Sequence, residues 1–250
     1  MAASSSSSKS VIDFLEGKNV FVFDTETTGL PDRVPGAKWG TSSEYWNYTI
    51  NEKYERSRIV SIAWAFVRSF DKVVVGNETI QHYIRYPDGF NDIPTTHIHG
   101  ISFETALRQG IPFCDIFENC GLYENLMRVD YIVAHNVNFD VHILLNELYR
   151  LDTDNATNAI RHILNLLSLG RCICTGELGK DICKLEYKSK FKPNVSNQDT
   201  DIKLDTNKKF KRYKMPKLVE LYKHFYGCEF EDAHNAEGDV RALLKCLQKM

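Results

Sequence analysis

The chain has 250 residues, of which 43% are hydrophobic and 26% charged, and its formal net charge at pH 7 is −2. This length and composition exclude wholesale disorder and predict one large α/β domain with a full core. The small net charge excludes a uniformly basic surface, so any nucleic-acid interface has to be local.

The first 17 residues open with the serine-rich stretch MAASSSSSKS. Because this stretch offers little apolar surface, we predict a disordered N-terminal tail over residues 1–17. It has no apolar core of signal-peptide length, and no later window approaches the length of a membrane span. We therefore expect an intracellular protein, of the cytoplasm or nucleus, with no membrane partner.

Residues 18–250 are predicted to form the folded domain, which begins with an apolar strand over residues 19–26. Residues 31–58 are polar and aromatic without clear periodicity, which is typical of a long surface insertion. Two or three antiparallel strands are expected between residues 58 and 87, with a turn at Gly76 and Asn77.

Helices are predicted over residues 103–110 and 112–128, the second as one amphipathic helix. A short strand over residues 130–134 then leads through a polar turn into a helix with apolar residues at steps of three and four. The remaining elements are expected to be a helix over 158–169, a strand over 171–175 and helices over 215–227 and 233–248.

A second insertion is predicted over residues 180–214. Residues 180–217 contain twelve Lys and Arg against five acids, a local formal charge of +7. This segment is either a solvated loop or an arm that follows phosphates.

Two groups of residues leave alternatives open. Trp39, Tyr45, Trp46 and Tyr48 in the first insertion either stack on unpaired bases or pack on their own domain, and packing is favoured. The cysteines 172, 174 and 183 lack the paired spacing of a structural zinc site, so buried thiols are favoured over zinc.

Carboxylates stand at the ends of three separate elements. Asp24 and Glu26 end the first strand, two residues apart, and therefore point to the same face. Asp140 and Asp239 lie in the first turns of two predicted helices. If the sheet brings them to one edge, their repulsion needs a hard divalent cation such as Mg²⁺ or Mn²⁺. His234, just before the last helix, is then suited to take a proton from an attacking water molecule.

Three segments, FDTETTGL, AHNVNFD and HNAEGD, look like the three motifs of the histidine-type DEDD exonucleases, the family of polymerase proofreading subunits, RNase T and oligoribonuclease. They stand in the family's order, and the resemblance extends through SRIVSIAW, IHGIS and CICT to cover roughly residues 18–248. It implies an RNase H-like mixed five-stranded sheet flanked by helices and a 3′ to 5′ exonuclease site with two divalent cations.

The resemblance also implies a role for each signature residue. Asp24, Glu26 and Asp239 would hold one cation, Asp24 would bridge to the second, Asp140 would act partly through water, and His234 would deprotonate the nucleophilic water.

Five further residues are expected to contact substrate. Backbone groups of Thr27 and Thr28 would hold the 3′ hydroxyl, while Leu30 and the loop around His99 would pack on the last base. Asn136 is either a substrate contact or only a helix cap.

The expected activity is hydrolysis of single-stranded nucleic acid from its 3′ end, releasing nucleoside 5′-monophosphates, with DNA favoured. Two alternatives remain: an exoribonuclease that trims RNA 3′ ends, and a catalytically idle nucleic-acid-binding module. A polymerase supplied as a separate chain is a further expected partner.

Overall fold

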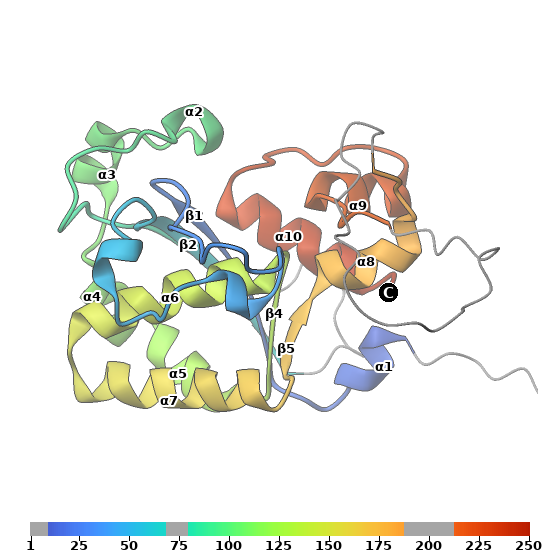
Figure 1. Ribbon diagram of the computed structural model, residues 1–250, viewed down its shortest axis with the longest axis horizontal. Helices are drawn as coiled ribbons and strands as arrows, with labels where there is room; N and C mark the ends of the chain where they lie inside the picture. The colour runs from blue at the N-terminus through green and yellow to red at the C-terminus, as the bar shows by residue number, and fades with distance from the viewer. Residues whose placement is uncertain (1–9, 69–79, 188–212) are drawn as a thin grey trace, which may run out of the picture.

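In the computed structural model, which describes residues 10–68, 80–187 and 213–250, the first apolar run forms the central strand of a five-stranded sheet (Figure 1). The strand order is β3-β2-β1-β4-β5, in which β1 is antiparallel to β2 and parallel to β4. The sheet is therefore mixed, as predicted. Its strands are β1 (Val20–Thr27), β2 (Ile59–Val67), β3 (Gln81–Ile84), β4 (Tyr131–Ala134) and β5 (Cys172–Cys174).

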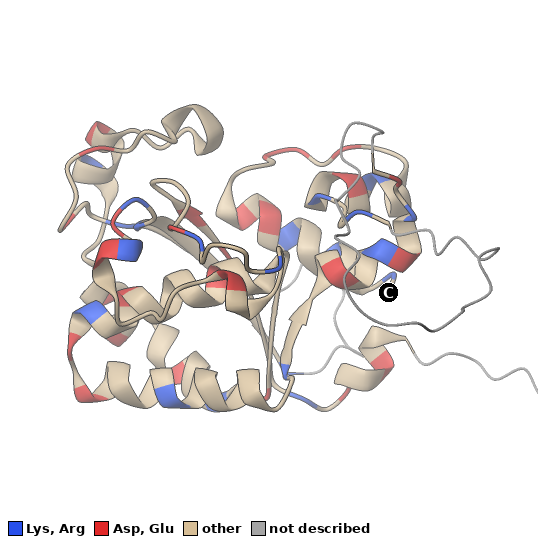
Figure 2. Cartoon of the chain, in the orientation of Figure 1, with Lys and Arg blue, Asp and Glu red and all other residues tan. Residues whose placement is uncertain are grey.

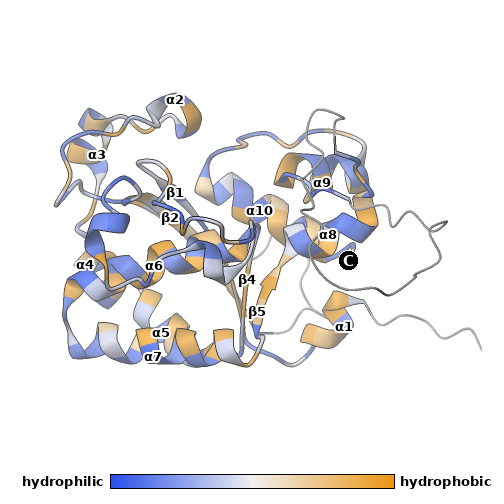
Figure 3. Cartoon of the chain, in the orientation of Figure 1, coloured by the Kyte–Doolittle hydropathy of each residue, from blue (hydrophilic) through white to orange (hydrophobic). Residues whose placement is uncertain are grey.

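Helices cover both faces of the sheet, because side chains alternate along β1. Phe21 and Phe23 enter a core with one group of helices, and Val20 and Val22 enter a second core with the other group. Figure 3 shows α7 with apolar and polar residues interspersed along its length, as expected for a helix with one buried side. The first group is α4 (Phe113–Asn119), α5 (Leu122–Arg128), α6 (Val137–Leu151) and α7 (Asp154–Ser168), and the second is α1 (Val11–Leu15) and α10 (Ala236–Leu247).

The remaining helices lie outside these two layers. Helices α8 and α9 pack on each other, and α9 also packs on α10. They are α2 (Thr96–His99), α3 (Phe103–Gln109), α8 (Thr175–Cys183) and α9 (Leu218–Tyr226), with short 3₁₀ turns η1 (Ser42–Glu44) and η2 (Asn51–Lys53).

A buried ion-pair network joins α6 to the sheet. Glu147 on α6 is 1% exposed, and its carboxylate accepts hydrogen bonds from Arg58 Nε at 2.9 Å and Nη2 at 3.1 Å. Arg85 Nη1 lies 2.6 Å from Glu147 Oε1, and the Ile59 N–H donates to the same oxygen at 3.0 Å. Burial raises the pKa of Glu147, but the charges of Arg85 and Arg58 outweigh it and hold this pKa at about 2.

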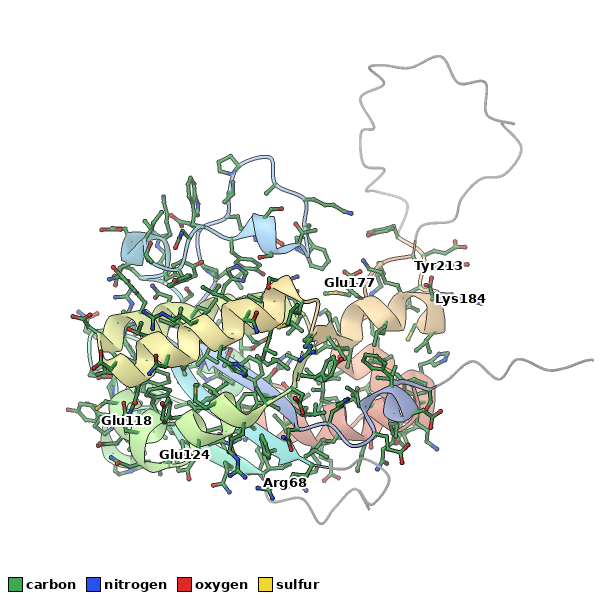
Figure 4. All side chains as sticks on the ribbon, turned by 90° about the horizontal axis from the view of Figure 1, so that it is seen from below. Arg68, Glu118, Glu124, Glu177, Lys184 and Tyr213 are labelled. Atoms are coloured by element: carbon green, nitrogen blue, oxygen red, sulfur yellow. The ribbon has the colours of Figure 1, made fainter. Side chains whose placement is uncertain are left out.

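The segment 31–58, which was predicted to be a surface insertion, lies against α6 (Figure 4). The Asn146 side chain donates to Tyr48 O at 2.7 Å, and the ring of Tyr45 stacks on His142 at 4.7 Å between centroids. Tyr45 is 8% exposed, and Trp46 and Tyr48 pack against the core, which confirms the packing prediction for these three. Trp39, by contrast, is 51% exposed.

Two predicted boundaries were wrong. The predicted tail over residues 1–17 includes ordered structure, because α1 begins at Val11 and buries Leu15 completely in the second core, while residues 1–9 lie outside the described residues. The helix predicted over 112–128 is two helices, because Gly121 adopts a left-handed conformation (φ 86°) that a continuing helix does not allow.

Parts of the two predicted loops lie outside the described residues. The turn predicted at Gly76 and Asn77 is not among the described residues, and neither is most of the lysine-rich segment, from 188 to 212. The second insertion was predicted to begin at residue 180, but residues 180–183 belong to α8. No helix in the described ranges is long and apolar enough to cross a membrane.

Candidate nuclease site

The end of β1 places Asp24 and Glu26 beside α10. Both continue the face on which Val20 and Val22 pack against this helix. Strand β4 pairs with β1 only from Val20 to Val22, whereas β2 pairs along the whole strand. The acids therefore lie where β1 extends beyond β4.

Asp239 comes to the same place from α10. Asn235 caps this helix by accepting from the Glu237 N–H at 3.0 Å, which puts Asp239 in the first turn. Figure 2 shows acidic residues where α10 begins. One carboxylate oxygen from each of Asp24, Glu26 and Asp239 lies within 4.8 Å of the other two. Three of the four acids that were predicted to converge therefore lie together.

Asp140 approaches from the other side of β1. It lies in the first turn of α6 and is 2% exposed. Its Oδ1 accepts hydrogen bonds from the Thr25 hydroxyl at 2.7 Å and the Thr25 N–H at 3.1 Å. Asp140 is not part of the group of three, but its charge raises the pKa of both Asp24 and Glu26.

Burial raises the pKa of all four acids, and repulsion by neighbouring acids adds to the rise for Asp24, Glu26 and Asp140. Burial, followed by the charges of Asp239 and Asp140, raises the pKa of Glu26 to about 8. Burial raises the pKa of Asp140 to about 7 although its bonds to Thr25 oppose the rise, and it raises that of Asp239 to about 7. For Asp24, burial and the three neighbouring acids raise the pKa well above its ordinary value.

This group of acids fits a hard divalent cation. No lysine or arginine of the described chain forms an ion pair with any of the four. Within the described ranges, no side-chain cation pairs with this concentration of negative charge, and the donors are all oxygens, which Mg²⁺ and Mn²⁺ prefer. In the described part of the chain, one group of His, Cys, Asp or Glu side chains is spaced closely enough to hold a metal ion, and it consists of Asp24, Glu26 and Asp239. The cysteines at 172, 174 and 183 do not form such a group.

His234 lies just before α10, as predicted. Its backbone is left-handed (φ 67°), its N–H bonds to the Asp239 carboxylate, and the residue is exposed. His234 therefore lies directly before the helix turn that carries Asp239, and its backbone is bonded to that carboxylate.

The segment after β1 lines a cavity of about 590 Å³ through Thr28, Gly29 and Leu30. Leu30 is 64% exposed. The Thr28 N–H, however, donates to Arg58 O at 2.9 Å, and Thr27 O accepts from the Thr95 hydroxyl at 2.6 Å. The role of Thr27 and Thr28 in holding a 3′ hydroxyl stays a prediction. Because the Thr28 N–H and Thr27 O already have partners, that role needs other backbone groups of these residues.

His99 is 8% exposed, and both of its ring nitrogens have partners. Nδ1 accepts from the Ile101 N–H at 3.2 Å, and Nε2 lies 3.0 Å from the Thr95 hydroxyl that donates to Thr27 O. Burial lowers the pKa of His99. In this structure His99 supports the segment after β1 through Thr95, and its contact with a base stays a prediction.

Asn136 occupies the N-cap position of α6 in a left-handed conformation (φ 66°), but its side chain makes no capping hydrogen bond. Instead, it bonds to Tyr45, whose pKa is raised by burial and then by the charges of Glu44 and Asp140. The simple capping role considered for Asn136 is therefore not observed.

Sequence reasoning missed two residues of this site. Thr25 holds Asp140, and its position between two acids on a strand was a signal that it faces α6. Tyr45 lies near Asp140 and Asn136, and nothing in its local sequence indicated this contact.

The fold is shared with exonuclease I of Escherichia coli. Its zinc-bound complex with single-stranded DNA superposes with a TM-score of 0.55 at 17% identity, over 92% of this chain and 39% of that one. An exonuclease I structure described as suggesting how processivity is achieved gives 0.56 at 17% identity, over 91% and 39%. The complex with a dA16 oligonucleotide gives 0.53 at 18%, over 91% and 39%.

This chain spans about two fifths of the length of these exonuclease I structures. No protein-family model and no curated protein sequence matches it. The likeness shows the fold alone, an α/β domain with a mixed five-stranded sheet flanked by helices, as predicted.

Proposed function

We propose that this chain is a divalent-cation-dependent 3′ to 5′ exonuclease of single-stranded nucleic acid, with DNA as the favoured substrate. The observation that carries the proposal is the meeting of Asp24, Glu26 and Asp239 within 4.8 Å, with Asp140 bonded across the same strand. The shared fold supports it, since exonuclease I has been solved with single-stranded DNA.

In this proposal Asp24, Glu26 and Asp239 would hold one cation, and Asp24 with Asp140 would hold a second. The fit rests on the convergence of oxygens from Asp24, Glu26 and Asp239, which pair with no lysine or arginine among the described residues. When bound, the cations supply Lewis-acid polarisation of the phosphate and neutralise charge that develops during hydrolysis.

His234 acts as the general base. Its imidazole takes a proton from water while the water oxygen bonds to phosphorus and the bond from phosphorus to the 3′ oxygen of the preceding nucleotide breaks. The products are a nucleoside 5′-monophosphate and a strand shorter by one nucleotide. The exposure of His234 gives this group access to substrate water.

Matched oligomers of DNA and RNA test this proposal. Each is labelled at its 5′ end and incubated with the purified chain with and without Mg²⁺. We expect a ladder of shortened products only with the cation, with DNA degraded faster than RNA. Faster loss of RNA would make the chain an exoribonuclease, and binding without shortening would make it an idle module.

The variant Asp24→Asn is the control for a contaminating nuclease, because it removes one charge from the acidic group while keeping side-chain shape. Equal activity of this variant and the unmodified chain would refute the proposed site.

A further inference from the structure

Lys38 and Trp39 form an exposed pair on the segment 31–58. Trp39 is 51% exposed, whereas the neighbouring aromatic residues Tyr45, Trp46 and Tyr48 pack on the domain. Lys38 is exposed, and it forms no ion pair with any residue that the structure describes. An exposed lysine and an exposed tryptophan are thus consecutive residues of this loop.

The loop that carries this pair is held in place by Glu44. This carboxylate is 3% exposed and accepts from the Gly40 N–H at 2.6 Å, while Arg33 Nε lies 2.9 Å from its other oxygen. The Thr41 hydroxyl donates to Lys38 O at 2.6 Å. These bonds fix the backbone on both sides of Trp39, so that binding a ligand there orders little additional chain.

The same loop is attached to the helix that carries Asp140. The Asn138 side chain donates to Gly40 O at 2.9 Å, and Asn138 precedes Asp140 by two residues in the first turn of α6. The residue after Trp39 is therefore joined directly to the first turn of the helix that carries Asp140.

A cavity of about 800 Å³ opens beside this loop. It lies between the segment 31–58, the start of α6, and β5 with α8, where Glu177 is labelled in Figure 4. The segment 31–58 contributes Ser42 to its lining, and the other polar lining residues are Asn138, Ser168, Glu177 and Asp181. The cavity leaves room next to the loop for a planar group the size of a nucleobase.

We propose that Lys38 and Trp39 form an accessory site for one nucleotide of a single strand, in which the base stacks on Trp39 and the phosphate pairs with Lys38. This inference rests on the proposed function. In the proposed function the 3′-terminal nucleotide occupies the acidic site. All other nucleotides of the strand lie on its 5′ side, so the accessory nucleotide lies on the 5′ side of the hydrolysed bond.

The residue types support this ligand class. An exposed aromatic ring stacks on any base, because every base has a π face, and an adjacent lysine provides the charge that a phosphate needs. The site would make the enzyme prefer longer strands without selecting sequence.

The variant Trp39→Ala tests the site, with Trp39→Phe as the conservative variant and Phe14→Ala as the matched control. Phe14 is 55% exposed and lies on α1, whose neighbour in the core is Val20 at the opposite end of β1 from the acids. Hydrolysis of a dinucleotide and a dodecanucleotide is compared. For Trp39→Ala we expect unchanged kcat/KM on the dinucleotide and a KM for the dodecamer raised about 5 to 150 fold. Trp39→Phe should restore most of the loss, and Phe14→Ala should change neither substrate.

A second measurement does not depend on hydrolysis. The chain has three tryptophans, of which Trp64 is fully buried and Trp46 packs against the core. Without divalent cations, a dodecanucleotide should quench the fluorescence of Trp39, and the quenching should vanish in Trp39→Phe. The salt dependence of binding should fall by about 0.7 in log–log slope in Lys38→Gln, because one phosphate contact is lost.

The two proposals fail separately. Equal KM values and equal quenching in the Trp39 variants and the unmodified chain would overturn the accessory site while exonuclease activity stands. Quenching that depends on Trp39 in a chain that shortens no strand would support the accessory site and overturn the proposed function.

Discussion

Replacing Glu147 with glutamine removes a negative charge that faces two buried arginines. Arg58 and Arg85 are 4% and 3% exposed, so water cannot replace the lost carboxylate. On folding, the pKa of Glu147 falls from an ordinary 4.5 to about 2, which corresponds to about 3 kcal/mol in favour of the ionised form. Breaking a buried ion pair by removing one partner typically costs about 3 to 5 kcal/mol. We therefore expect Glu147→Gln to lower the free energy of unfolding by about 3 kcal/mol or more.

Urea unfolding at neutral pH measures this loss, and Glu55→Gln is the control. Glu55 also pairs with an arginine, Arg150, at 2.9 Å, but its side chain is 52% exposed, and an exposed pair contributes at most about 1 kcal/mol. A loss below about 1 kcal/mol in Glu147→Gln would refute the reasoning.

The pH dependence of the same variant gives a second check. Because the folded-state pKa of Glu147 is depressed, its contribution is fully present above pH 4.5 and is lost as the pH falls towards 2. The difference in stability between the unmodified chain and Glu147→Gln should therefore shrink below pH 4.5. A difference that stays constant down to pH 2.5 would contradict the assigned ion pairs.

Three further predictions concern the acidic site. His234→Ala should lose about 10² to 10⁴ fold in activity, while isothermal calorimetry shows unchanged cation uptake; lost uptake would contradict its role as a base. Asp24→Asn should abolish uptake and lose more activity than His234→Ala, and a higher residual rate would reverse the roles. Glu26→Gln should stabilise the cation-free chain, because burial and the charges of Asp239 and Asp140 raise the pKa of Glu26 to about 8, so that its ionisation destabilises the fold as the pH rises from 4.5 to 8. Thermal unfolding without cations should show a larger gain at pH 8 than at pH 5, and equal gains would refute this assignment.

The acidic group could be predicted from the sequence because its geometry follows from local rules. Strand periodicity puts Asp24 and Glu26 on one face, and a cap residue puts Asp239 in the first turn of its helix. These local rules do not show that the elements are neighbours in space, and the resemblance to the exonuclease family implied it. The structure confirms that the three carboxylates meet, and their catalytic roles stay proposals.

The rest depends on contacts between distant parts of the chain, which periodicity does not report. The attachment of Tyr45 and Gly40 to α6 joins residues about 100 positions apart. Leu15 follows a serine-rich stretch, and its burial depends on a core formed by β1 and α10. The break at Gly121 had a local signal, since glycine readily adopts a left-handed backbone, but the apolar pattern continues across it.

The hydrogen bonds between Asp140 and Thr25 affect how mutants of this aspartate should be read. Beyond Val22, no strand of the described chain pairs with β1 on the β4 side, and the Asp140 carboxylate accepts the Thr25 N–H that a longer β4 would otherwise bind. An alanine at position 140 would leave a buried main-chain donor without an acceptor, so inactivity of that variant would mix misfolding with lost chemistry. Asparagine keeps an oxygen for Thr25 and is the informative replacement.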